Sequence, residues 1–183
     1  VAGLITIWSA DRTGLFLLKE IEITQQDKIP KSYSQYLLVL QADLDNLKGK
    51  NLWSFDLSEV EKILNKYKWV ESFNISRKFP KTLLIEVIPK SSVAMLYHPR
   101  EGLRPITAES ELLPTVDPAI APRVPVLQET KFYKSVDLRK RAVELLKQMP
   151  QEGAMKLSEL SEVTVDNEKR LWVTHLKTRT LVH

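Results

Sequence analysis

The spacing of apolar residues predicts that the chain is built around one helix followed by a strand hairpin. The helix is indicated by apolar residues that recur at a helical period, at Leu57, Val60, Ile63, Leu64 and Tyr67. The run Trp69–Phe79 then alternates apolar and polar residues, and the run 82–88, TLLIEVI, is rich in β-branched and apolar residues with no strand breaker. Pro80 and Lys81 separate the two runs, which predicts a short antiparallel hairpin.

The residues before this centre predict one more strand and one more helix. Leu15–Thr24 alternates like a half-buried strand, and Tyr33–Leu47 has an apolar stripe at helical spacing, with Gly49 as its stop signal. Asp56 is expected to cap the second helix, which should begin at Asp56 or Leu57 and end near Tyr67. The order is therefore βααββ, with both helices expected on one face of a three-stranded sheet.

Beyond Pro89 the pattern predicts a second domain that is mostly antiparallel β with one helix. Short strands are expected over 91–97, 103–107, 111–116, 126–128, 157–165 and 171–182. The helix is expected over Ser135–Met149, with inward-facing residues at Val136, Ala142, Val143, Leu146 and Met149. The fold class is thus α+β, with the end of a membrane segment and a juxtamembrane linker expected over 1–14, a βααββ domain over 15–90 and a β domain over 91–183.

The first eight residues, VAGLITIW, leave two interpretations open. A membrane-spanning helix needs about 20 apolar residues, so eight cannot span a bilayer but are compatible with the end of such a helix. Trp8 and the polar SADRT after it fit an interfacial exit. The alternative is a strand or a buried helix end.

Composition removes several classes of function. The 183 residues are 43% hydrophobic and 27% charged, with net charge +4 and no cysteine, which excludes disulfides and thiolate sites. Basic residues alternate with acidic ones, so we expect no nucleic-acid interface. His98, His175 and His183 lack metal-ligand spacing, and no nucleophile has a recognisable base. We therefore predict no catalytic residue, metal, cofactor or small-molecule substrate.

Several short motifs resemble the POTRA domain of the FtsQ/DivIB family of bacterial cell-division proteins. They are Asn-Leu-Trp-Ser-Phe-Asp at 51–56, Trp69-Val70, the hairpin string Arg-Lys-Phe-Pro-Lys-Thr-Leu at 77–83, and then Ile85, Val87 and Ala94. The resemblance is strongest over Leu15–Leu96. Its structural motif residues are Asp56, Trp69, Val70, Phe73, Arg77, Pro80 and Leu83. Trp69 is expected in the core, and Arg77 and Lys78 at a solvated strand end.

The resemblance implies a non-enzymatic divisome scaffold, anchored in the cytoplasmic (inner) membrane by a single helix. The two domains would lie on its periplasmic or extracellular side at the septum. The family recruits the FtsB–FtsL pair, which connects it to septal peptidoglycan synthesis, and receives FtsB by strand addition near the C-terminal edge. The residues expected at that edge are Trp172, Val173, His175, Leu176, Thr180, Leu181 and Val182. The apolar residues among them fit a docking edge or a core strand equally well.

A second interpretation is a POTRA module of an outer-membrane assembly or secretion protein, which handles extended peptides by the same strand addition. Such proteins carry repeated POTRA domains and a long alternating β-barrel. Neither pattern is found in this sequence.

Overall fold

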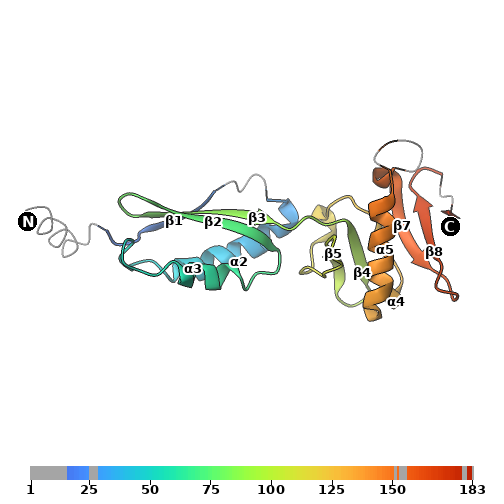
Figure 1. Ribbon diagram of the computed structural model, residues 1–183, viewed down its shortest axis with the longest axis horizontal. Coiled ribbons are helices and arrows are strands. Elements are labelled where there is room, and N and C mark those ends of the chain that lie inside the picture. The colour runs from blue at the N-terminus through green and yellow to red at the C-terminus, as the bar shows by residue number, and fades with distance from the viewer. Residues whose placement is uncertain (1–15, 25–28, 151, 153–155, 179–180, 183) are drawn as a thin grey trace, which may run out of the picture. The chain divides into compact units, whose positions relative to one another are not determined.

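The computed structural model describes residues 16–24, 29–150, 152, 156–178 and 181–182. The chain divides into two units, Val1–Pro89 and Lys90–His183. Figure 1 shows the elements of each.

The first unit is a three-stranded sheet with two helices on one face (Figure 1). Its elements are β1 (Glu20–Thr24), a 3-10 turn (Lys31–Tyr33), α2 (Ser34–Asp45), α3 (Ser58–Leu64), β2 (Val70–Lys78) and β3 (Thr82–Pro89). The strand order is β1-β3-β2, with β1 parallel to β3 and β2 antiparallel to it. The predicted order of strands and helices is therefore correct.

The core of this unit forms where the helices meet the sheet. Leu40 and Leu44 of α2 and Val60 and Leu64 of α3 are fully or almost fully buried, at the helical spacing that the sequence predicted. On the sheet they meet the inward residues of β3, of which Ile85 is fully buried. Removing this apolar surface from water stabilises the unit.

Several boundaries in this unit differ from the predicted ones. The first strand begins at Glu20, and Leu18 is buried just before it while Leu17 is exposed, because the backbone of 16–18 pairs with 49–52 instead of the sheet. Helix α3 ends at Leu64, three residues early. Phe79, the last residue of the predicted strand, lies beyond the end of β2 and is largely exposed at the hairpin tip.

The second unit is a six-stranded sheet. Its elements are β4 (Ala94–His98), β5 (Gly102–Ile106), β6 (Val126–Leu127), α4 (Thr130–Lys134), α5 (Val136–Gln148), β7 (Leu160–Val165), β8 (Leu171–His175) and β9 (Leu181–Val182), with 3-10 turns at Pro118–Ile120 and Leu157–Glu159. The order is β5-β4-β6-β7-β8-β9. β6 runs parallel to both its neighbours, and the other pairs are antiparallel.

Helix α5 packs on this sheet and supplies much of the core. Ala142, Val143 and Leu146 are buried in one cluster with residues of β4, β6, β7 and β8. Ser135 caps the helix by accepting a hydrogen bond from the Leu138 amide at 3.2 Å.

Three expectations for the second unit were wrong. Val136 is exposed rather than inward, because it is the first helical residue and Leu138 takes the buried position. The short helix α4, which places Phe132 in the core, was missed. The predicted strand 171–182 is two strands, since the chain turns at 176–178.

Candidate partner-binding edge

Strand β9 forms one edge of the six-stranded sheet. It pairs with β8 through Val173–Val182 and Thr174–Leu181. Within the described residues, no strand pairs with the other side of β9. An edge strand presents unpaired backbone amides and carbonyls, which a further strand can use.

The opposite edge of the same sheet is covered by the chain itself. The segment after β5 folds back along it, with bridges Leu103–Val116 and Ile106–Leu112. The Val116 amide donates to the Leu103 carbonyl at 2.9 Å, and the Leu113 amide to the Pro105 carbonyl at 2.9 Å. The β5 edge is therefore closed to a partner strand along much of its length.

The residues that the sequence predicted for the edge have different environments. Val173 is buried in the core, His175 is buried, Trp172 is half-buried, and Leu176 is 60% exposed. Leu181 and Val182 form β9, and Thr180 lies outside the described residues. The prediction thus combined core and edge residues, because the alternation along β8 turns every second side chain inward.

His175 lies inside the turn between β8 and β9. Its Nε2 is 3.2 Å from Glu159 Oε2, and its Nδ1 accepts hydrogen bonds from the amides of Lys177 and Thr178, both at 3.3 Å. A neutral ring that donates from Nε2 satisfies all three contacts. His175 therefore has a less direct role than the predicted one of a binding side chain. Its ring shapes the turn that positions β9.

Glu159 is the second member of this turn cluster. Hydrogen bonds from Lys177 and His175 hold the pKa of its carboxyl below the usual value of 4.5. In addition, the Leu176 amide donates to the Glu159 carbonyl at 2.6 Å. Side-chain and backbone contacts thus fix the start of the turn against the 3-10 turn before β7.

Trp172 is tied to the turn at the other end of β8. Its Nε1 donates to Asp166 Oδ2 at 3.2 Å, and Arg170 Nε donates to the same oxygen at 2.7 Å. These bonds, together with those from backbone amides, hold the pKa of Asp166 far below 3.8, with Arg170 the largest contributor. The indole side chain therefore orders the β7–β8 turn as well as lining β8.

The motif residues of the first unit are structural. Trp69 is fully buried and stacks on Tyr33, with ring centroids 5.5 Å apart, and Leu83 is also fully buried. Phe73 and Val70 are half-buried in β2, paired opposite Val87 and Pro89, and Pro80 follows a cis peptide bond at the hairpin. Asp56 lies two residues before α3, and its carboxylate accepts a hydrogen bond from the amide of the first helical residue, Ser58, at 2.9 Å. It therefore caps the helix less directly than predicted.

Arg77 corrects the prediction that it is a solvated strand end. Its Nε donates to the Leu52 carbonyl at 2.7 Å and its Nη2 to the Phe55 carbonyl at 3.1 Å. The guanidinium also lies over the Phe55 ring, 5.9 Å from its centroid. Arg77 therefore ties β2 to the 51–55 loop, a contact between residues too far apart in sequence for a local pattern to indicate. Lys78 is exposed, as predicted, and pairs with Glu22 at 3.7 Å.

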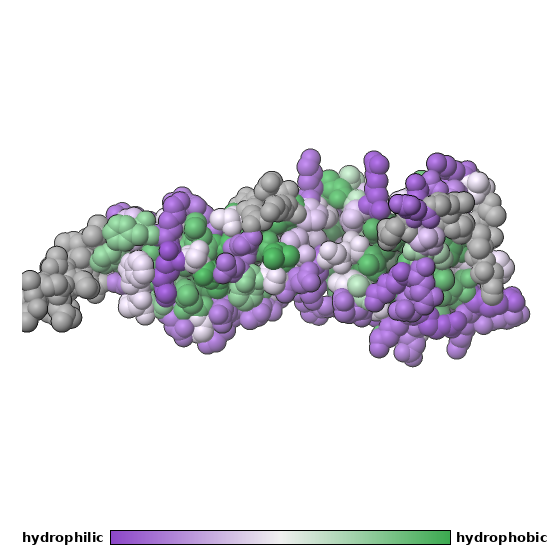
Figure 2. All heavy atoms as spheres, turned by 45° about the horizontal axis from the view of Figure 1, so that its top comes forward, coloured by the Kyte–Doolittle hydropathy of each residue, from purple (hydrophilic) through white to green (hydrophobic). Residues whose placement is uncertain are grey.

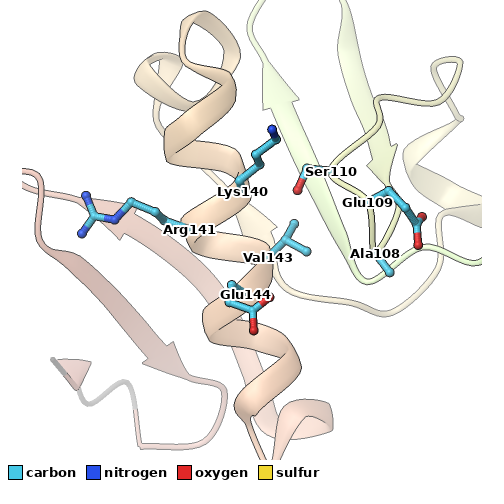
Figure 3. A pocket seen from close by; sticks show the side chains of 7 residues that line it. All are labelled: Ala108, Glu109, Ser110, Lys140, Arg141, Val143 and Glu144. Carbon is cyan, nitrogen blue, oxygen red and sulfur yellow. The ribbon is translucent and has the colours of Figure 1, made fainter.

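One hollow of the second unit is lined by side chains that form no recognisable catalytic set. It measures about 400 Å³ and is open, and the loop 108–110 and the helix α5 line it (Figure 3). Figure 3 shows Val143 facing the loop, whereas Arg141 is directed away from it. Elsewhere in the described chain, no group of three acidic, histidine or cysteine side chains is arranged to hold a metal.

Comparison with known proteins agrees with this geometry. Residues 16–88 match the FtsQ-type POTRA domain family. Cell division protein FtsQ of Myxococcus fulvus is 33% identical over 48 residues, which is 26% of this chain and 17% of that protein's length.

The chain is thus a POTRA-containing protein, in which a βααββ domain is followed by a mostly antiparallel β unit. The resemblance to the FtsQ/DivIB family of cell-division proteins is confirmed, and the POTRA domain is of the FtsQ type.

Proposed function

We propose that this protein is a non-enzymatic scaffold of the bacterial division machinery. The FtsQ-type POTRA match and the named FtsQ relative support a role in cell division. Because the matched region spans only 17% of that relative, the activity and partners of the whole protein form part of this proposal.

The scaffold recruits the FtsB–FtsL pair and so connects to septal peptidoglycan synthesis. FtsB binds by adding a strand to the free side of β9. The observation that carries this assignment is the difference between the two sheet edges: segment 111–116 covers β5, whereas β9 has no neighbour beyond it among the described residues.

The physical basis of this binding is backbone pairing. An added strand gains hydrogen bonds from the edge amides and carbonyls, and alternate side chains supply the specificity. β9 is short, and within the part of the chain that the structure describes it pairs with Val173 and Thr174 of β8. Leu176, which is 60% exposed beside the turn, offers apolar surface to the same partner.

The scaffold acts at the cytoplasmic (inner) membrane of the septum, with both units on the outer side of that membrane. Residues 1–8, whose sequence is compatible with the end of a membrane helix, lie outside the described residues. Among the residues described, no helix combines the length and apolarity that a membrane crossing needs.

The test is an NMR titration of the whole chain with a peptide of the FtsB C-terminus. We expect the largest shifts at backbone amides between Trp172 and Val182, because a new strand pairs there. Amides of β5 (Gly102–Ile106) serve as the internal control, since that edge is already covered.

A scrambled peptide of the same composition controls for non-specific charge effects. If the second unit stays folded and Trp172–Val182 show no shift with the native peptide, the strand-addition proposal is wrong. Shifts concentrated at β5 instead would contradict the choice of edge.

A further inference from the structure

One end of the POTRA domain carries exposed aromatic rings that contribute little to its core. Trp53 is 50% exposed and Phe79 is 65% exposed. Phe79 touches Phe16 edge-to-face, with centroids 6.0 Å apart. Leu17, next to Phe16, is also exposed. Figure 2 shows apolar surface, in light green, at this end of the unit.

Backbone contacts bring three segments together at this end: 16–19, 50–55 and 77–81. The Leu52 amide donates to the Phe16 carbonyl at 2.8 Å, and the Lys19 amide to the Lys81 carbonyl at 2.9 Å. Arg77 joins the third segment to the second through the Leu52 carbonyl. The exposed rings therefore lie on loops and a hairpin tip that are held in place by these bonds, rather than on a flat sheet face.

The charges on the same three segments have one sign. They contain Lys19, Lys50, Arg77, Lys78 and Lys81, and no aspartate or glutamate. Lys50 pairs with Glu59 and Lys78 with Glu22, both from outside the segments. For Lys19 and Lys81, no carboxylate partner is found among the described residues. Lys81 lies in the hairpin turn with Phe79, and its carbonyl accepts the hydrogen bond from the Lys19 amide.

We propose that this end of the POTRA domain, defined by Phe16, Leu17, Trp53 and Phe79 with Lys19 and Lys81, binds the surface of an anionic lipid bilayer. Aromatic side chains favour the boundary between hydrocarbon and headgroups. Lysine amines next to them attract the lipid phosphates. Rings at loop tips can enter that boundary, and the one-signed basic charge beside them matches anionic headgroups.

The proposal goes beyond the scaffold role, because it involves the POTRA domain and needs no strand partner. It assigns to the segments 16–19, 50–55 and 77–81 a direct membrane contact, which would orient the domain at the bilayer. The two proposals fail separately, since lipid binding is measured without any FtsB peptide.

The test uses flotation of the whole chain with vesicles of phosphatidylcholine, with and without phosphatidylglycerol. The double variant Trp53→Ser, Phe79→Ser removes the two exposed rings. The matched control is Leu38→Ser, Val39→Ser on α2, whose side chains are 73% and 55% exposed on another part of the same domain. All four positions are exposed, so we expect each variant to fold, as circular dichroism will check.

We expect wild type and the α2 control to bind anionic vesicles alike, and the Trp53/Phe79 variant to bind roughly tenfold or more weakly, given the apolar area lost. Lys19→Glu, Lys81→Glu should weaken binding only to vesicles that contain phosphatidylglycerol.

Residues 1–8 are common to all variants, so a second readout isolates Trp53. Brominated lipids quench tryptophans that reach the acyl boundary, and the quenching lost in Trp53→Phe reports that residue alone. Equal binding by wild type and the Trp53/Phe79 variant, or quenching unchanged by Trp53→Phe, would overturn the proposal.

Discussion

The two units differ in where their most informative residues lie, in the interior of the first and at a sheet edge of the second. In the POTRA domain, the residues that identify the family face inward: Trp69 and Leu83 are in the core, and Arg77 binds the carbonyls of Leu52 and Phe55. In the second unit, the proposed site is the edge strand β9, which is recognised by its place in the backbone pairing of the sheet and not by a sequence motif. A sequence motif can therefore identify a fold while the proposed binding surface lies in a region that has little recognisable motif.

The largest expected effect comes from breaking the POTRA core at Trp69. Trp69→Ala should destabilise this unit by about 3–5 kcal/mol, because it removes a fully buried ring and leaves a cavity. Trp69→Phe should cost much less, since the indole Nε1 is buried without a hydrogen-bond partner in the described structure.

Denaturant unfolding, followed by NMR signals assigned to each unit, measures the effect of Trp69→Ala. The second unit should keep its stability. Equal loss of stability in both units would show that they do not fold separately and would weaken the comparison.

Neighbouring basic residues of β2 provide a sharper test within the POTRA domain. Arg77→Met should cost about 1.5–3 kcal/mol, because the guanidinium makes charge-assisted bonds to two carbonyls. Lys78→Gln should change stability by less than about 0.5 kcal/mol, since its ion pair with Glu22 is exposed. Similar costs for the two variants in chemical denaturation would refute the tie between β2 and the 51–55 loop.

A smaller, pH-dependent effect is expected in the second unit at Asp166. The folded pKa of this carboxyl lies below its usual value of 3.8, so its ionised form stabilises the fold above that pH. The contribution is lost as the pH falls toward the folded pKa. Wild type should therefore be more stable than Asp166→Asn at pH 7, and the difference should shrink in acid.

Thermal unfolding of both proteins between pH 7 and pH 2 measures this difference. A gap that stays constant with pH would mean that the Asp166 charge does not hold the β7–β8 turn.

The periodicity of apolar residues predicted most of the fold, because burying one face of a helix or strand imposes a regular spacing on its apolar residues. The apolar stripe of α2 is buried at Leu40 and Leu44, β3 buries Leu83, Ile85 and Val87, and the βααββ order agrees with the predicted one. The misplaced features depend on contacts between distant residues. The strand begins later than predicted because residues 16–18 pair with 49–52, and Arg77 is held by carbonyls more than twenty residues away.

The candidate site was located only in part for the same reason. The apolar pattern of 171–182 indicates strand, but alternation alone does not separate Val173, which faces the core, from β9 at the edge. The turn at 176–178 was hard to recognise because it has no glycine: His175 fixes it by accepting amide hydrogen bonds. Likewise, Ser110 adopts a left-handed φ of 66°, a backbone conformation that glycine adopts more easily.

The central claim is that the free side of β9 accepts a partner strand, and one affinity comparison tests it most directly. Calorimetry should measure binding of the FtsB C-terminal peptide to the wild type and to Val182→Pro, which disrupts β9 because proline cannot donate to a ladder. The account predicts that the wild type binds and that Val182→Pro, still folded by circular dichroism, loses binding. Unchanged affinity in folded Val182→Pro would contradict it.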